Sequence, residues 1–160
     1  MSISSFHPPV RTLMGPGPSD VHPRILEALG RPTLGHLDPL FVGMMDELKS
    51  LLKYAFNTEN ELTLPISAPG SAGMEACFVN LVEPGDTVIV CINGVFGTRM
   101  EDVAQRLGAN VDSLKFEWGT VVELAPVQEI LAEKKYDLVA LVHAETSTGV
   151  CNPVAEIGKL

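Results

Sequence analysis

The chain has 160 residues, enough for one domain, and its net charge of −9 argues against a nucleic-acid partner, because phosphates would be repelled. Its apolar content of 46% excludes intrinsic disorder, and its three cysteines, without a CxxC pair, argue against a disulfide scaffold or a zinc cluster. No apolar run approaches the ~18 residues of a membrane helix. The start, MSISSFHPPVRTL, lacks the apolar core of a secretory signal, so we expect an acidic globular protein of the cytoplasm.

The N-terminal part of the chain is predicted to hold two helices joined by irregular segments. MGPGPSDVHP contains too many prolines and glycines for a regular element, and a short helix is predicted over 23–29. Asp38 is a candidate N-cap for a second helix, with Pro39 in its first turn. Apolar residues at helical spacing, from Phe41 to Ala55, extend this helix to about Phe56.

From residue 61 the pattern changes to alternating strands and helices. The β-branched run TVIVCI is typical of a strand that is buried on both faces of a parallel sheet. The predicted strands are 62–67, 87–92, 110–114 and 137–143, and the predicted helices are 74–82, 96–107 (ending at Gly108) and 126–134. This alternation, with short turns, predicts an α/β fold with a parallel sheet flanked by helices.

Three turns that follow predicted strands are candidate binding loops, because ligands of parallel α/β sheets bind beyond the carboxyl ends of the strands. The first is SAPGSAG, in which Gly70, Ser71 and Ala72 would present backbone N–H groups and one hydroxyl to an anion. Pro69 contributes no N–H. The alternative is an ordinary strand-to-helix turn, and the local sequence favours neither.

The second loop, NGVFG, places Phe96 between two glycines. An aromatic side chain in such a loop can stack on a flat ligand. Taken alone, the pattern favours the simpler interpretation, in which Phe96 anchors the start of a helix to the core.

The third loop, HAETSTG, gathers His143, Glu145, Thr146, Ser147 and Thr148 after a buried strand. These side chains could hydrogen-bond a heteroaromatic ring or act as general acid and base. A helix-capping loop, in which the hydroxyls satisfy backbone groups, is the equally weighted alternative.

The remaining histidines are predicted to be ordinary surface or loop residues, and the cysteines to be part of the packing. His7, His22 and His36 are scattered without metal-ligand spacing. The three cysteines lie in or beside apolar runs, and we interpret them as small buried hydrophobic residues: Cys77, Cys91 and Cys151.

Together, the motifs LMGPGPSDVHP, RPTLGH, APGSAGMEA, EPGD, NGVFG and HAETSTGV resemble those of the class V, fold-type I aminotransferases that use pyridoxal 5′-phosphate (PLP). The resemblance is greatest to the alanine–glyoxylate and serine–glyoxylate aminotransferase group and runs from about Leu13 to Leu160. It implies an N-terminal segment, 1–37, that lines the active site and the dimer interface. Residues 38–160 would then be the first part of the PLP-binding large domain.

The resemblance also implies roles for individual residues. Gly70, Ser71 and Ala72 correspond to the phosphate-binding turn, although many relatives have Ser-Gly-Thr where this chain has Pro-Gly-Ser. Phe96 corresponds to the aromatic ring that stacks on the cofactor, and Thr146 to a hydroxyl that hydrogen-bonds near its ring. The substrate side is implied for three further residues: Gly15, Gly17 and His36, the last in a loop that reaches the partner subunit of a homodimer.

The implied activity is transfer of an amino group from a small amino acid, serine or alanine, to a 2-oxo acid such as glyoxylate. The family's cofactor-binding lysine, its aspartate at the pyridine nitrogen and its substrate-binding arginine are expected downstream of Leu160, so no catalytic residue is assigned here. Two alternatives are another class V chemistry, such as ureidoglycine or phosphonate transamination or desulfuration, and a non-catalytic chain that binds a phosphate-bearing ligand.

Overall fold

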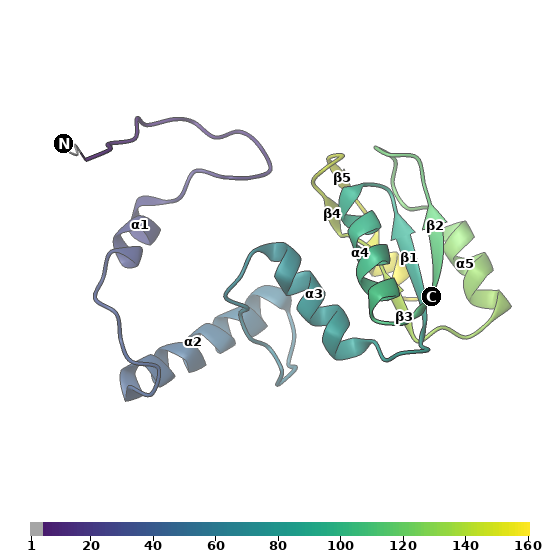
Figure 1. Ribbon diagram of the computed structural model, residues 1–160, viewed down its shortest axis with the longest axis horizontal. Helices are drawn as coiled ribbons and strands as arrows, with labels where there is room; N and C mark the ends of the chain where they lie inside the picture. Colours follow the sequence, from purple (N-terminus) through teal and green to yellow (C-terminus); the bar gives the residue numbers. More distant parts are fainter. Residues whose placement is uncertain (1–4) are drawn as a thin grey trace. The chain divides into compact units, whose positions relative to one another are not determined.

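A computed structural model describes residues 5–160; the first four residues of the predicted N-terminal segment lie outside this range. The chain divides into two compact units, Met1–Pro65 and Ile66–Leu160. Figure 1 shows helices α1 and α2 in the first unit, and the sheet with its helices in the second. The domain limits implied by the resemblance, 1–37 and 38–160, concern the arrangement of a complete enzyme and stay a prediction.

The two helices of the first unit form where they were predicted. Helix α1 is Pro23–Leu29, and His22 Nδ1 accepts a hydrogen bond from the Arg24 N–H at 3.2 Å. Helix α2 is Pro39–Phe56, and the Asp38 carboxylate accepts from the Leu40 N–H at 2.8 Å. Neither helix has a buried residue within the described part of the chain, so their apolar stripes remain open to solvent.

The second unit has a parallel sheet with strand order β2-β1-β3. Its strands are β1 (Thr87–Ile92), β2 (Asn110–Lys115) and β3 (Leu138–Ala140), and both β2 and β3 pair in parallel with β1. Its helices are α3 (Gly70–Leu81), α4 (Val95–Arg106), α5 (Leu124–Glu133) and α6 (Val154–Ile157). The predicted fold class, a parallel sheet flanked by helices, is confirmed.

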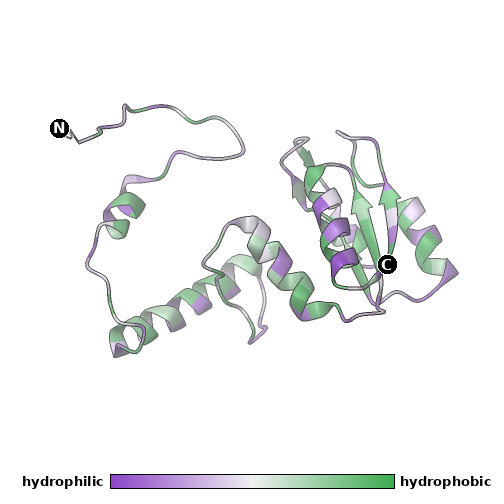
Figure 2. Cartoon of the chain, viewed as in Figure 1, coloured by the Kyte–Doolittle hydropathy of each residue, from purple (hydrophilic) through white to green (hydrophobic). Residues whose placement is uncertain are grey.

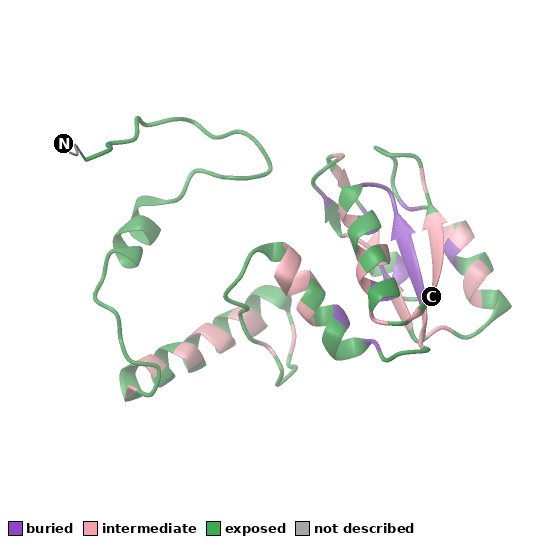
Figure 3. Cartoon of the chain, in the orientation of Figure 1, coloured by how far each residue is buried: buried purple, intermediate pink, exposed green. Residues whose placement is uncertain are grey.

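Strand β1 is the centre of the core, which Figures 2 and 3 show as an apolar and buried strand. Val88, Val90 and Ile92 face one side and pack with Phe78 of α3 and Ala104 of α4. The alternate residues pack on the other side with α5 and α6, in a second cluster: Ile89, Cys91, Val122, Val127 and Ile157. Burial on both faces explains why β1 has no polar side chain after Thr87.

The close approach of α4 to β1 depends on Gly97. A Cβ at this position would lie 3.0 Å from Ile92 Cα and 3.1 Å from the Cys91 carbonyl oxygen. Both contacts are with backbone, which cannot move aside as a side-chain tip can. Glycine is therefore required at this point of α4 for steric reasons.

Two sequence predictions about strands are corrected by the structure. Residues 62–67 form no strand: their backbone makes local bonds, such as Ala68 N–H to the Ile66 oxygen, and no strand within residues 5–160 pairs with them. The last predicted strand, 137–143, is shortened to β3. Its final carbonyl groups, on Val142 and His143, instead accept hydrogen bonds from the side chain and backbone of Asn152.

The HAETSTG loop is a β-hairpin rather than an irregular loop. Strands β4 (Ala144–Glu145) and β5 (Val150–Cys151) pair antiparallel, with Glu145 opposite Val150. Only Cys91 is buried, so the interpretation of Cys77 and Cys151 as buried residues is wrong.

Within residues 5–160, no helix is long and apolar enough to cross a membrane.

Candidate functional site

The first candidate loop is the start of helix α3 itself, four residues earlier than predicted. Pro69 is the N-cap and provides no side-chain cap, and its carbonyl oxygen accepts from Ala72 N–H at 2.9 Å and Gly73 N–H at 3.3 Å. Within the described part of the chain, the N–H groups of Gly70 and Ser71 have no acceptor. This turn therefore offers two free donors at the positive end of the helix dipole.

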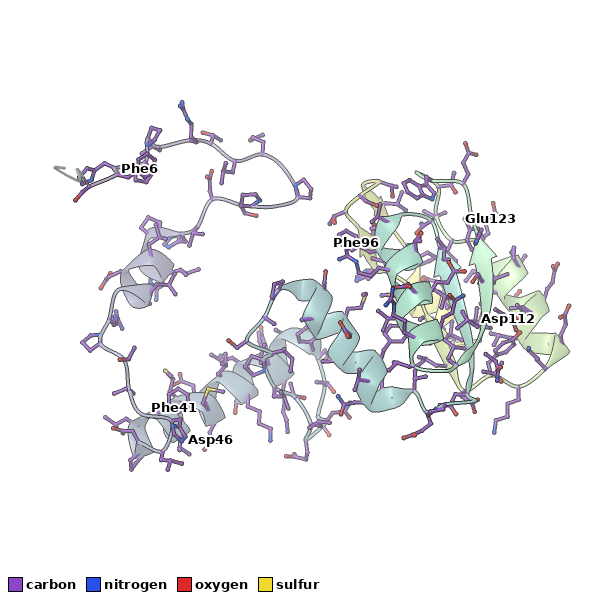
Figure 4. All side chains as sticks on the ribbon, viewed as in Figure 1. Phe6, Phe41, Asp46, Phe96, Asp112 and Glu123 are labelled. Atoms are coloured by element: carbon purple, nitrogen blue, oxygen red, sulfur yellow. The ribbon has the colours of Figure 1, made fainter. Side chains whose placement is uncertain are left out.

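The second candidate loop is the start of α4, and the hairpin fixes it. The N–H groups of Phe96 and Gly97 donate to Glu145 Oε2 at 3.1 and 3.3 Å, and Val95 N–H donates to Ser147 Oγ at 3.0 Å. The backbone of Phe96 is thus held by residues from the third loop. In Figure 4, the labelled Phe96 lies near the start of α4, on the side of the hairpin.

Glu145 is fully buried, and every polar contact of its carboxylate is structural. Oε1 accepts from the N–H and the hydroxyl of Ser147 at 3.2 and 2.6 Å, and Oε2 accepts from the α4 N-terminus. A Cβ at Gly94 would overlap the Glu145 side chain and lie 2.7 Å from Ser147 Oγ, so no other residue fits there. Ser147 and Glu145 therefore cap the start of α4, in agreement with the helix-capping alternative for these two residues, and general acid–base work by Glu145 is not supported.

Arg99 connects the first and second loops. Its guanidinium hydrogen-bonds Ser71 Oγ and lies 5.4 Å from the centroid of the Phe96 ring. Ser71 and Phe96, which the sequence placed in separate loops, are therefore brought together by one side chain. Arg99 was not predicted from the sequence, although its position three residues after Phe96 puts both side chains on the same helix face.

A buried pair of side-chain amides, Asn93 and Asn152, connects the segments next to the candidate loops. Asn93 Nδ2 donates to Asn152 Oδ1 at 2.9 Å and to the Thr120 oxygen at 2.8 Å, and Asn152 Nδ2 donates to Asn93 Oδ1 at 3.3 Å. Asn152 Oδ1 also accepts from Val122 N–H at 3.0 Å. The pair joins the residue after β1, the loop between β2 and α5, and the segment after β3 to the end of the hairpin. The pair was not predicted, because Asn93 before Gly94 and Asn152 before Pro153 are each typical of a turn.

Thr146 is exposed at the tip of the hairpin, between two residues that bind α4. Its hydroxyl has no hydrogen-bond partner among residues 5–160. A shallow hollow of about 200 Å³ lies over the hairpin and is lined by Ala144, Glu145, Thr146, Gly149, Val150 and Cys151. The hydroxyl is therefore available to a ligand, and its predicted role stays a prediction.

The three residues implied for the substrate side lie in the first unit. Gly15 and Gly17 form a bend, His36 lies in a turn, and all three are exposed. No neighbouring atom lies within 4 Å of a Cβ built on either glycine. Their approach to the loops of the second unit stays a prediction.

No group of three or more His, Cys, Asp or Glu residues within residues 5–160 could hold a metal ion.

Comparisons with known proteins agree on one family. The aminotransferase class-V family model matches residues 26–160. The chain is 41% identical over 151 residues to the (S)-ureidoglycine–glyoxylate transaminase of Bacillus subtilis, covering 94% of this chain and 36% of that protein. It is 42% identical over 152 residues to the alanine–glyoxylate aminotransferase of Oryctolagus cuniculus, covering 95% of this chain and 39% of that protein.

A solved structure is similar over nearly the whole chain. The alanine–glyoxylate aminotransferase from a Nostoc species superposes with a TM-score of 0.92 at 44% identity, covering 99% of this chain and 43% of that one. The 160 residues thus span less than half the length of the relatives that they match.

Proposed function

The chain belongs to the class-V aminotransferase family, and from this membership we propose that its three loops bind PLP in an enzyme that transfers an amino group to glyoxylate. The amino donor proposed first is a small amino acid, alanine or serine. The names of the relatives from Oryctolagus cuniculus and Nostoc support alanine and glyoxylate as the substrate pair.

One observation carries this proposal: side-chain bonds unite the three loops. Arg99 on α4 contacts Ser71 at the start of α3, and Glu145 of the hairpin binds the backbone of Phe96. A site that recognises PLP needs donors for a phosphate, a flat apolar face for a ring and a hydroxyl or amide for the ring substituents. The loops supply these groups from α3, α4 and the hairpin in turn.

The donor set fits the phosphate of PLP. The free N–H groups of Gly70 and Ser71, the Ser71 hydroxyl and the nearby guanidinium of Arg99 are all suited to an anion. Pro69 removes one donor that a Ser or Thr would supply, so Arg99 and the helix dipole carry more of the binding here.

When bound, PLP supplies an electron sink that weakens a bond to the α-carbon of an amino acid. Gly70 and Ser71 would hold its phosphate, and the half-buried ring of Phe96 would cover one face and exclude water there. Thr146 would donate or accept a hydrogen bond at the edge of the ring. Glu145 is not expected to contact PLP or the amino acid. Its role is to hold the start of α4 in place.

The remaining machinery is proposed to lie outside these 160 residues. The resemblance implies a lysine, an aspartate and a substrate-binding arginine, and none of the six lysines lies in a loop of the candidate site: Lys49, Lys53, Lys115, Lys134, Lys135 and Lys159. We also propose a cytoplasmic homodimer in which His36 approaches the partner subunit.

An assay of the gene product that contains this chain tests the activity. With glyoxylate as acceptor, alanine or serine should yield glycine, and Phe96→Leu should lower kcat/KM about tenfold or more through loss of the stacking face. Phe116→Leu is the matched control, because Phe116 packs in the core beside α5 and should leave kcat/KM nearly unchanged. Absence of glycine with every amino donor, in a protein that binds PLP, would overturn the proposed reaction.

A second amino donor is supported by a specific comparison. The identity to the (S)-ureidoglycine–glyoxylate transaminase is 41%, against 42% for the alanine enzyme, so ureidoglycine is the alternative donor. Turnover with ureidoglycine and none with alanine or serine in the same assay would select it.

A further inference from the structure

Arg99 makes two contacts within the protein that its proposed attraction for a phosphate does not require. Its side chain leaves α4 one turn after Phe96, and its guanidinium reaches Ser71 Oγ at the start of α3 while lying over the Phe96 ring, 5.4 Å from the centroid. Ser71 and Phe96 belong to different candidate loops, 25 residues apart in numbering. Arg99 is a side chain that contacts both of them.

The hydrogen bond also orients the Ser71 hydroxyl. A guanidinium can only donate, so the Ser71 oxygen must accept. The hydroxyl proton of Ser71 then remains free to donate to another acceptor. A ligand oxygen near the free N–H groups of Gly70 and Ser71 is such an acceptor.

Arg99 extends from a part of α4 that is held by several contacts. The start of α4 is fixed by the buried Glu145 carboxylate, which accepts from Phe96 and Gly97. Gly97 packs directly on the backbone of β1. Arg99 therefore extends from a fixed helix toward the turn that begins α3, and that turn has no side-chain cap of its own.

The charge of Arg99 is not neutralised by a carboxylate. Among residues 5–160, the ion pairs of arginine are Arg31 with Glu27 and Arg106 with Asp102, and Arg99 forms none. In a chain with a net charge of −9, an unpaired guanidinium beside two free N–H donors favours an anionic group at this turn.

We propose that Arg99 is a positioning residue for the cofactor: it fixes the Ser71 hydroxyl relative to the Phe96 ring, so that one flat ligand with a phosphate meets both. This inference rests on the proposed function. Arg99 covers one face of the ring, and the ligand would use the other. The expected ligand class is a phosphorylated aromatic ring, and the unphosphorylated ring should depend on Arg99 much less.

The test compares PLP with pyridoxal, which lacks the phosphate, by titration calorimetry on the gene product. Arg99→Gln should raise the dissociation constant for PLP about tenfold or more, since the Ser71 hydroxyl loses its orientation and the positive charge beside the phosphate is removed. For pyridoxal the change should stay within about threefold, and Arg99→Lys should recover part of the PLP affinity. Arg106→Gln, about two turns further along α4, is the matched control and should leave both constants unchanged.

A double variant tests whether Arg99 acts through Ser71. Ser71→Ala combined with Arg99→Gln should weaken PLP binding no more than the stronger single variant does, because the two side chains act as one unit. Additive losses would contradict this. So would equal losses for PLP and pyridoxal accompanied by a lower Tm, which indicate a purely structural role.

Failure of the inference and failure of the proposed function give different results. If the unaltered protein binds PLP and Arg99→Gln binds it equally well, only the inference is wrong. If the unaltered protein does not bind PLP, the proposed function is overturned and the inference with it.

Discussion

Glu145 shows how a single residue can be misread from sequence and still matter to the site. Its place among hydroxyl residues after a buried strand suggested acid–base chemistry, but its carboxylate accepts four hydrogen bonds and has no solvent contact. The decisive partners, Phe96 and Gly97, are nearly fifty residues away in the chain. Local sequence could reveal the capping residue type but not the helix that it caps.

Glu145→Gln is predicted to destabilise the protein. Glutamine has one acceptor oxygen, so its NH₂ group must face backbone donors that now bind Oε1 or Oε2. The unfolding free energy should fall by about 1–3 kcal/mol, measured by urea denaturation. Glu129→Gln, on the exposed face of α5, is the control and should change it by less than about 0.5 kcal/mol. Equal stability of the two variants would contradict the capping role.

Cys91 is predicted to be the unreactive cysteine of the three. Burial raises the pKa of its thiol to about 11, whereas Cys77 and Cys151 are exposed. The thiolate is the reactive form, so iodoacetamide at pH 8 should label Cys77 and Cys151 and spare Cys91 until the protein unfolds. Peptide mass spectrometry measures the labelling, and equal rates at all three cysteines would show that β1 is not buried.

The same burial gives a pH dependence with a definite sign. The folded pKa of Cys91 lies above the unfolded value of 9.0, so the folded state keeps the proton when the unfolded state has lost it. The contribution of Cys91 to stability is therefore complete below pH 9 and is lost as the pH rises toward about 11. Cys91→Ala should flatten the fall in unfolding free energy over this range.

Among the elements, those with strong local signals were predictable. Asp38 and Pro39 fixed the start of α2, and the β-branched run of β1 indicated a strand buried on both faces. The predicted strand over 62–67 failed because a strand also needs a neighbour, and none within residues 5–160 pairs with it. Strand β3 is shorter than predicted because the Val142 carbonyl oxygen accepts a hydrogen bond from the Asn152 side chain instead of from a neighbouring strand.

Gly97→Ala tests the packing of α4 on β1. The added Cβ would meet backbone atoms of Ile92 and Cys91 at 3.0 and 3.1 Å, so the helix must move away from the strand. We expect a loss of about 1–3 kcal/mol of unfolding free energy. Gly73→Ala in α3 is the matched control: its Cβ meets nothing within 4 Å, and alanine should stabilise the helix by up to about 1 kcal/mol. Similar effects of both substitutions would contradict the close contact.

At the scale of the whole molecule, the sequence predicted the fold class and the three loops but not the bonds between them. Ser71 could be proposed for a site because it begins a helix, and Phe96 because it follows strand β1 at the start of a helix. Arg99, Asn93 and Asn152 were missed, since each acts on a partner that is distant in the chain. The pairing of such residues is a property of the folded chain, and no local pattern encodes it.

The apolar surface of the first unit leads to a prediction about association. Leu37, Leu40, Tyr54, Phe56 and Leu62 are each at least 73% exposed. Surfaces of this kind mark interaction sites or cause aggregation. The 160-residue chain expressed alone should bind a hydrophobic dye and elute from size-exclusion chromatography as dimers or larger species. A monomer that binds no dye would show that this surface is covered within the chain.

A crystal structure of the gene product grown with PLP tests the central claim most directly. We expect the phosphate at the N–H groups of Gly70 and Ser71, next to the Ser71 hydroxyl, with the pyridine ring against Phe96 and the Thr146 hydroxyl near the edge of the ring. A cofactor bound elsewhere, or bound with its phosphate away from the start of α3, would contradict it.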